Sequence, residues 1–289
     1  MPKLTFTGHE TFHCRHFWLK KGYDFYTNFE APSIEESILE LGVGKNMVSA
    51  IDFWLKAFAI RDGEKNLTEL ADRIFGEDGY DPYLENHGSL WLLQYYLINA
   101  EVASIYSMVF KDFRKTRIDS QFTSQQLLRY LFREIERGSS TTIKENTLKS
   151  DIKVFLRTYF LNNKSQKDLE DDLSSLLIEL SLVHKIETDS LAEGEYYKIN
   201  VTERQEIPAA IFMFAILDSF QDEVSISFDK IKEKVADAFA CNDEGLELQI
   251  RNITENYPFA TYKEDAGRKE LQFKDTPSKW TILHEYYRG

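Results

Sequence analysis

The sequence predicts a mainly α-helical protein with small β-hairpins, organised as tandem winged helix-turn-helix-like units. Apolar residues recur at helical spacing over most of the chain, which is the primary signal for amphipathic helices. Short strand-like stretches around a turn follow these helices at three places. Helix, turn, second helix and hairpin is the order of a winged helix-turn-helix, and its repetition predicts more than one such unit.

The first unit begins at SIEESILELG, where Ser33 and Glu36 have the spacing of a capping box. The glycines of LGVG interrupt the helix, and KNMVSAIDFWLKAF resumes it. Five apolar residues of this second helix are predicted to face inward: Val48, Ile51, Trp54, Leu55 and Phe58. The following Asp62-Gly63 predicts a hairpin turn between two short strands.

The second unit contains helices predicted over 122–137 and 146–160, the latter capped by Asn146. Five residues of the latter are predicted to face inward: Leu148, Ile152, Phe155, Leu156 and Tyr159. A third helix is predicted over LEDDLSSLLIELSL, residues 169–182, and a hairpin over 183–201.

The third unit starts with an apolar helix over 207–220 and continues with two amphipathic helices. It ends in a hairpin over 259–273, whose turn bears a glycine. Together the patterns predict three winged-helix-like domains over 1–112, 113–203 and 204–289, the first with an aromatic helical extension.

Composition indicates a folded protein of the cytoplasm. Cys14 and Cys241 lie far apart without a C-x-x-C spacing, which fits a reducing compartment and gives no disulfide framework. No signal peptide is recognised. The most apolar stretch, residues 88–110, includes Gln94 and Glu101, so it predicts a pair of buried helices rather than a membrane span.

The segment HETFH, residues 9–13, matches the H-E-x-x-H spacing of zinc metalloproteases. Those enzymes need both histidines on one face of a helix, with a further ligand. Gly8 directly precedes the motif, and no distant third ligand stands out. A local metal site would draw on His9, His13, Cys14 and His16. We interpret the segment as structural, with its polar groups tied into the core, and expect no metal and no cofactor.

Two other motif-like stretches are excluded by their details. GVGKN, residues 42–46, has Asn46 where a phosphate loop needs Ser or Thr, and a helix rather than a strand precedes it. GEDGYDPYLE, residues 76–85, lacks the spacing of a calcium-binding EF-hand. It is interpreted as an acidic connection or as a surface for a basic partner.

The first candidate DNA contacts are Lys45, Asn46 and Ser49, at the start of the predicted second helix of the first unit. The first residues of such a helix approach base edges in the major groove. Asn can pair with adenine and Lys with guanine or phosphate. The alternative is a protein-contacting helix, because Asp52 follows on the same helix.

A basic island provides the second candidate. The chain has a formal net charge of −13, yet residues 101–160 carry 11 basic and 7 acidic groups. Four cations recur at spacings of four to five residues: Lys144, Lys149, Lys153 and Arg157. A similar stripe on the preceding predicted helix comprises Arg129, Arg133 and Arg137. Such stripes are typical of phosphate contacts, whereas nearby Glu134, Glu136 and Asp151 favour an ordinary solvated face.

Long motifs throughout the chain resemble the bacterial domain of unknown function 4007 family. They are GHETF, RHFWLKKGYD, LGVGKNMV, WLKAF, LTELADRIFGEDGYDPYLE, SLWLLQYYL, TLKSDIKVFLRTY, LEDDLSSLLIEL and EYYRG. In that family the positions of His13 and Cys14 are usually Pro and an aliphatic residue, which implies that HETFH is accidental. The resemblance also implies a role in DNA modification or phage defence, because the family's genes lie beside those for DNA phosphorothioation. Other genes near those of the family encode enzymes that resemble PAPS reductases and cysteine desulfurases.

These lines lead to one expectation and two alternatives. We expect a non-catalytic DNA-binding or targeting subunit of a bacterial DNA phosphorothioation or antiviral defence system. Its partners would be double-stranded DNA and a PAPS-reductase-like or cysteine-desulfurase-type protein, with no membrane. The first alternative is a scaffold that binds the sulfotransfer enzyme without contacting DNA. The second, weaker alternative is a metal-dependent hydrolase that uses HETFH.

Overall fold

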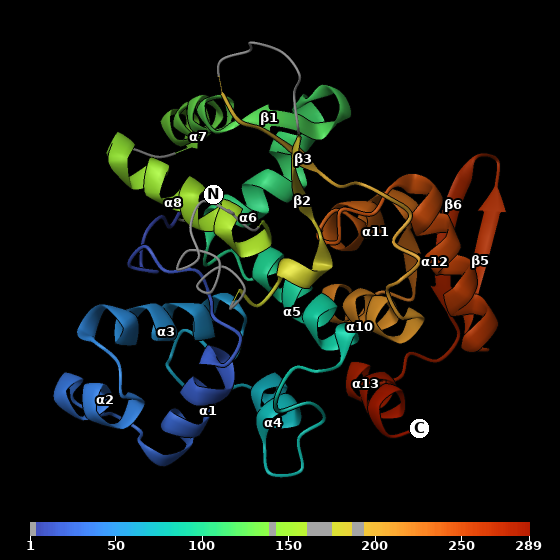
Figure 1. Ribbon diagram of the computed structural model, residues 1–289. Helices are drawn as coiled ribbons and strands as arrows, with labels where there is room; N and C mark the ends of the chain where they lie inside the picture. Colours follow the sequence, from blue (N-terminus) through green and yellow to red (C-terminus); the bar gives the residue numbers. More distant parts are fainter. Residues whose placement is uncertain (1–3, 139–142, 161–174, 187–193) are drawn as a thin grey trace. The chain divides into compact units, whose positions relative to one another are not determined.

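The computed structural model describes residues 4–138, 143–160, 175–186 and 194–289 (Figure 1). These residues are mainly helical with two small antiparallel sheets, as predicted. They form two compact units. Unit 1 lies within residues 1–85 and 96–200, and unit 2 comprises 86–95 and 201–289. The first two predicted domains therefore fall largely within unit 1, and the third lies within unit 2.

Unit 1 begins with a group of helices, two of which are the pair that the sequence predicts as the first helix-turn-helix. The group comprises α1 (Trp18–Asn28), α2 (Ile34–Leu41), α3 (Lys45–Ala57) and α4 (Glu69–Phe75), and the predicted pair is α2 and α3. Ser33 and Glu36 form the predicted capping box, and α2 ends at Leu41 with Gly42 as its C-cap, which has a left-handed φ of 58°. Val48, Ile51, Trp54, Leu55 and Phe58 are all buried, as predicted. The expected hairpin at Asp62-Gly63 is reduced to a single bridge between Arg61 and Leu67.

The second part of unit 1 continues from the chain's most apolar stretch. Its helical elements are the end of α5 (His87–Asn99), α6 (Ser104–Ser107), the π-helix η1 (Met108–Asp112) and the 3-10 helices η2 (Phe113–Thr116) and η3 (Ile118–Ser120). Ile105, Tyr106, Val109 and Phe110 are almost fully buried, so the predicted pair of buried helices is confirmed. No helix within the described ranges is both long and apolar enough to cross a membrane.

A three-stranded sheet with two helices completes unit 1. Its elements are β1 (Gln121–Thr123), α7 (Ser124–Gly138), α8 (Glu145–Tyr159), η4 (Ile178–Leu180), β2 (Val183–Ile186) and β3 (Tyr196–Ile199). The strand order is β1-β3-β2, and both pairs are antiparallel. Helices α7 and α8 pack against each other (Figure 1). The predicted hairpin over 183–201 is present as β2 and β3, although 187–193 lie outside the described residues.

Two predictions about this part of the chain are wrong. Helix α8 begins at Glu145 after Lys144, without a side-chain cap, so Asn146 is not the capping residue. The helix predicted over 169–182 lies partly outside the described residues, and its described part, 175–182, is not α-helical. Here the backbone N–H of Leu176 donates to the Cys14 carbonyl over 3.1 Å. Pairing with the N-terminal segment thus replaces the helical hydrogen bond that the periodicity predicts.

Unit 2 has a second sheet of the same plan. Its elements are the start of α5, α10 (Ala209–Ser219), β4 (Ser225–Ser227), α11 (Phe228–Ile231), the π-helix η5 (Lys232–Ala236), α12 (Asp243–Asn256), β5 (Ala260–Asp265), β6 (Arg268–Phe273) and α13 (Lys279–Arg288). The strand order is β4-β6-β5, again antiparallel. The predicted C-terminal hairpin is confirmed as β5 and β6. Ala266 and Gly267 at its turn have φ of 47° and 79°, which suits the right-handed twist of the strands.

The core of unit 2 gathers around α10, which packs against α12 and α13. Residues from the start of α5 complete it. Trp91 and Tyr95 are buried, and Gln94 donates from its side chain to the Ala238 carbonyl over 2.9 Å. The hydroxyl of Tyr95 donates to Asp218 over 2.8 Å. Burial raises the pKa of Tyr95 well above its ordinary value, so this phenol stays protonated and remains a donor.

Candidate nucleic-acid interface

Helix α8 presents the predicted basic stripe on its outward face. Lys149 and Lys153 are exposed and Arg157 is half-exposed, while Lys144 is exposed just before the helix. The helix buries its other side through Leu148, Ile152, Phe155, Leu156 and Tyr159, as predicted. The stripe therefore results from helical spacing of four residues on an amphipathic helix.

Asp151 does not belong to this outward face, contrary to what its position in the sequence indicates. It lies between Lys149 and Lys153 in the chain, but its side chain is only 3% exposed. Two residues along a helix correspond to about half a turn, which directs Asp151 toward the core. Glu145 does reduce the charge of the stripe, because its carboxylate lies 2.6 Å from Lys149 Nζ.

The second basic stripe, on α7, is more strongly neutralised. Glu134 lies 3.1 Å from both Arg133 and Arg137. Arg133 also rests over the Tyr130 ring at 5.5 Å. Surface pairs of this kind contribute little to stability, but they reduce the positive potential that a phosphate would meet. Of these two helices, α8 is thus the better candidate for a phosphate-binding surface.

The first candidate surface is also accessible. Lys45, Asn46 and Ser49 are exposed on the first turns of α3, and Gly44 before them supplies no side-chain cap. The negative charge of Asp52 argues against DNA binding at this helix, but its carboxylate is paired with two other residues. Its carboxylate pairs with Lys56 over 2.6 Å and with the buried guanidinium of Arg61.

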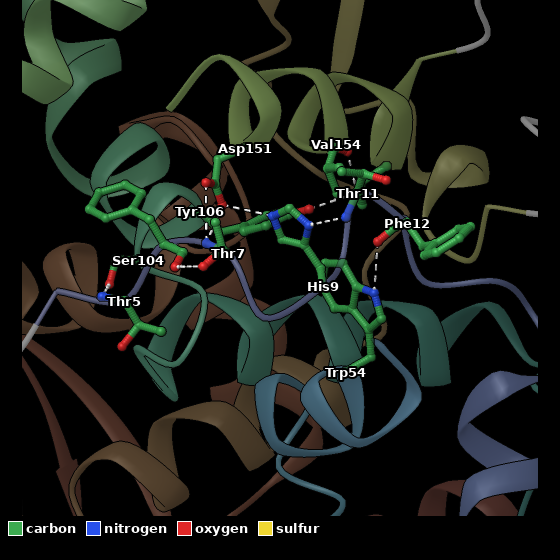
Figure 2. A network of polar contacts seen from close by, with 12 residues as sticks. Thr5, Thr7, His9, Thr11, Phe12, Trp54, Ser104, Tyr106, Asp151 and Val154 are labelled. Carbon is green, nitrogen blue, oxygen red and sulfur yellow. Dashed lines mark hydrogen bonds and ion pairs between the residues drawn. The ribbon is translucent and has the colours of Figure 1, made fainter. Parts of the chain in front are cut away.

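The N-terminal segment connects α3 with α8 (Figure 2). His9 Nε2 lies 2.7 Å from Asp151 Oδ1, and the imidazole ring stacks on Trp54 at 6.2 Å between centroids. The backbone N–H of Thr7 donates to both Asp151 oxygens over 3.1 and 3.2 Å. The indole N–H of Trp54 donates to the Phe12 carbonyl over 3.1 Å. His9 and the backbone groups of Thr7 and Phe12 are tied into the core, as the structural interpretation predicts.

The same network also reaches α6. The backbone N–H of Thr5 donates to Ser104 Oγ over 2.8 Å (Figure 2). On the same helix, Tyr106 shares a hydrogen bond of 2.7 Å with Thr158 of α8. Burial raises the pKa of Tyr106, so its hydroxyl remains protonated. Sequence reasoning missed Asp151 and Ser104 as partners of the segment, because no periodicity links residues so far apart in the chain.

The segment follows an irregular path. Thr7, Glu10 and Thr11 all have positive φ, of 68°, 48° and 70°. Such conformations cost of order 1–3 kcal/mol each and persist only where surrounding contacts enforce them. Gly8, with a φ of 96°, has no room for a side chain, because a Cβ would lie 2.5 Å from the Phe53 ring. The contacts of Thr7 and His9 with Asp151 are among those that hold this path.

HETFH lacks the geometry that a zinc metalloprotease requires. Residues 9–13 form a turn rather than a helix, and His9 Nε2 is engaged by Asp151. His16 Nε2 lies 2.9 Å from the Tyr83 carbonyl, and His13 and Cys14 are buried. Burial raises the pKa of the Cys14 thiol well above its ordinary value, which disfavours the metal-binding thiolate. Within the described ranges, no three His, Cys, Asp or Glu side chains are grouped to hold a metal ion.

A cavity of about 490 Å³ lies beside the basic face of α8. The start of α7, the length of α8 and strand β3 provide its walls. Its apolar lining comprises Leu128, Ile152, Leu156, Phe160 and Tyr197. Its polar lining comprises Ser124, Gln125, Glu145, Lys149, Lys153, Arg157 and Glu195. The cavity therefore joins three cations of the predicted DNA-binding set to an apolar floor, which the charge pattern of α8 alone does not predict.

A family model matches almost the whole sequence. The family described as "Protein of unknown function (DUF4007)" matches residues 6–287, and the chain belongs to it. No curated protein matches the chain significantly.

Two solved structures are similar to this chain over nearly its whole length. One is described as "Magnesium ion-bound SspB crystal structure", with a TM-score of 0.84 and 26% sequence identity. The other is described as "SspB crystal structure", with a TM-score of 0.81 and 25% identity. In both comparisons the similarity covers 99% of this chain and 88% of the other.

Proposed function

We propose that this protein is a DNA-binding subunit, without catalytic activity of its own, of a bacterial DNA sulfur-modification or antiviral defence system. The observation that carries the proposal is the exposed face of α8, where Lys149, Lys153 and Arg157 lie together while Asp151 turns to the core. Membership in the DUF4007 family supports the link to phosphorothioation that the resemblance implied.

The topology of the sheets supports winged helix-turn-helix units. In unit 1, α7 and α8 follow β1, and the hairpin of β2 and β3 closes the sheet in the order β1-β3-β2. Unit 2 repeats this plan with α11 and α12 between β4 and β5. Helices in such units enter the major groove. The α2–turn–α3 pair would add a further contact through Lys45, Asn46 and Ser49.

Local charge favours DNA at α8 despite the acidic chain. A duplex attracts cations that neutralise its phosphates, while a net charge of −13 opposes binding elsewhere on the surface. This contrast would orient the protein on DNA. The acidic remainder would be available to a PAPS-reductase-like or cysteine-desulfurase-type partner of the same system.

The test is fluorescence anisotropy of a labelled duplex, titrated with the full chain at two salt concentrations. Binding is expected to weaken steeply with salt, since cations that contact phosphates release counterions. The double variant Lys149→Glu with Lys153→Glu should bind about tenfold more weakly or worse, with a smaller salt slope. The matched control reverses two exposed lysines of unit 2, Lys234→Glu with Lys274→Glu, for the same change in net charge.

Equal weakening by both pairs would show only a net-charge effect and would contradict the assignment to α8. No binding at low salt, together with a stable complex with a sulfotransfer enzyme, would establish the scaffold alternative instead.

A second candidate is a magnesium-dependent activity on DNA. It is favoured by the similar SspB structure that is described as magnesium ion-bound. Mg²⁺ commonly takes only one or two protein carboxylates and keeps several waters. A bound Mg²⁺ beside DNA would polarise a phosphate for hydrolysis. Conversion of supercoiled plasmid to nicked circles only with Mg²⁺ would establish this candidate and would contradict a non-catalytic role; intact plasmid would exclude it.

A further inference from the structure

The cavity beside α8 combines features that neither the stripe nor an apolar core explains. Its volume of about 490 Å³ lies in the range of small-ligand sites, about 300–1,000 Å³. Its floor is apolar and includes the partly exposed ring of Phe160. Cations of α8 line the same space. A ligand that fits both parts must be flat and apolar at one end and anionic at the other.

The carboxylates of the cavity do not cancel this character. Glu145 is paired with Lys149 at 2.6 Å. Glu195 is paired with Lys185 at 2.7 Å and accepts a hydrogen bond of 2.8 Å from the hydroxyl of Tyr197. Lys153 has no ion-pair partner among the residues that the structure describes. An incoming anion therefore meets an available ammonium without having to break a pair.

The aromatic part of the cavity's floor, formed by Phe160 and Tyr197, is packed in place. The Phe160 and Tyr197 rings lie 6.0 Å apart at 74°, and Tyr197 also packs against Phe122 at 5.9 Å. Tyr197 is only 6% exposed, and burial, together with its bond to Glu195, raises the pKa of its hydroxyl. A rigid aromatic surface of this kind loses little conformational freedom when a ring stacks on it.

We propose that this cavity binds one nucleotide unit, with the base against Phe160 and the apolar floor and a phosphate at Lys153. Where the nucleotide is part of DNA, the inference rests on the proposed function and extends it. A base within a regular duplex is covered on both faces by its neighbours, so only an unpaired or extruded base can enter. A free nucleotide has the same chemistry, and the experiment below distinguishes the two sources.

The experiment compares two labelled duplexes by anisotropy, one fully paired and one with a single unpaired adenine. The full chain is expected to bind the second about fivefold more tightly or better, because stacking of one base on an aromatic ring is worth that much. Phe160→Ala should abolish the preference. Gln125→Trp should do the same by filling the cavity from an exposed position on α7, which keeps the test valid if Phe160→Ala fails to fold.

The matched control is Lys144→Glu against Lys153→Glu. Both lysines are exposed; Lys153 lies on α8 and Lys144 directly precedes the helix, but only Lys153 lines the cavity. Lys144→Glu should weaken both duplexes equally and leave the preference unchanged, whereas Lys153→Glu should reduce it.

Equal affinity of the unaltered protein for the two duplexes would overturn the inference and leave DNA binding intact. If neither duplex binds, the proposed function is contradicted. Calorimetry with free dAMP then tests whether the cavity binds a free nucleotide. Binding of dAMP that is lost in Lys153→Glu would assign the cavity to a free nucleotide. Absence of dAMP binding would overturn the inference as well.

Discussion

His9 Nε2 lies 2.7 Å from Asp151 Oδ1, and both side chains are 3% exposed. This contact joins a segment at the start of the sequence to the inner side of α8, whose outer side carries the lysines that are proposed to bind DNA. The carboxylate also accepts from the backbone N–H of Thr7. One buried carboxylate thus fixes both the segment and the helix.

Replacing Asp151 should destabilise unit 1 strongly. Asp151→Ala removes a buried acceptor from His9 and Thr7, and the expected loss in free energy of unfolding is about 3 kcal/mol or more. Urea denaturation followed by circular dichroism measures it. Glu136→Ala, at an exposed position of α7, should change the free energy by less than about 0.5 kcal/mol and serves as the control. Similar small losses in both variants would contradict the role of Asp151.

Tyr106→Phe should lower stability near neutral pH, by about 1 kcal/mol, because the hydroxyl loses its hydrogen bond with Thr158. The effect should depend on pH. Burial raises the folded-state pKa of Tyr106, so the unfolded chain releases this proton first and the stability of the unaltered protein falls above about pH 10. Phe has no proton to release, so the difference between the two proteins should shrink above that pH. Unfolding curves at pH 7 and pH 10.5 test this, and a constant difference would argue against burial as the cause.

Gly245→Ala should destabilise unit 2. A Cβ at this position in the first turn of α12 would lie 2.2 Å from the backbone carbonyl oxygen of Glu203, and a backbone atom cannot rotate aside as a side chain can. We expect a loss of about 2 kcal/mol or more in the free energy of unfolding. Gly63→Ala is the matched substitution, since a Cβ there meets nothing within 4 Å. Equal midpoints of thermal unfolding for both variants would refute the close approach.

Asn46→Ala should affect sequence preference more than overall affinity if α3 contacts DNA. An Asn that pairs with adenine discriminates by about 1–3 kcal/mol against other bases, whereas a Lys that meets phosphate does not discriminate. When duplexes are selected from a random pool, Asn46→Ala should therefore lose the preference for adenine at one position of the selected sequences. Lys45→Ala should weaken all sequences evenly. An unchanged preference in Asn46→Ala would remove this residue from the base-reading set.

Local sequence patterns predicted the elements whose contacts are themselves local. The Ser33–Glu36 box, the inward faces of α3 and α8 and the C-terminal hairpin all follow from spacing within a few residues. The cap at Asn146 failed because its prediction relied on residue preference alone, and the helix begins one residue earlier.

The sequence predicts the exposed cations of the candidate site but not the cavity beside them. Periodicity placed Lys149, Lys153 and Arg157 on one face, but it cannot say that Glu195, distant in the chain, lies beside them in the cavity. The failed part of the helix over 169–182 has the same origin. Its backbone pairs with the segment around Cys14, about 160 residues earlier, and tertiary pairing of this kind overrides helical spacing.

The division of unit 2 into 86–95 and 201–289 has a consequence for synthesis on the ribosome. Trp91 and Tyr95 leave the exit tunnel more than a hundred residues before Asp218 and Phe239, which they contact. Chains grow at about 5–20 residues per second, so these two rings wait for several seconds without their partners. The core of unit 2 cannot close until residues 201–289 have been synthesised, and a nascent chain stalled before that point would be a natural substrate for chaperones.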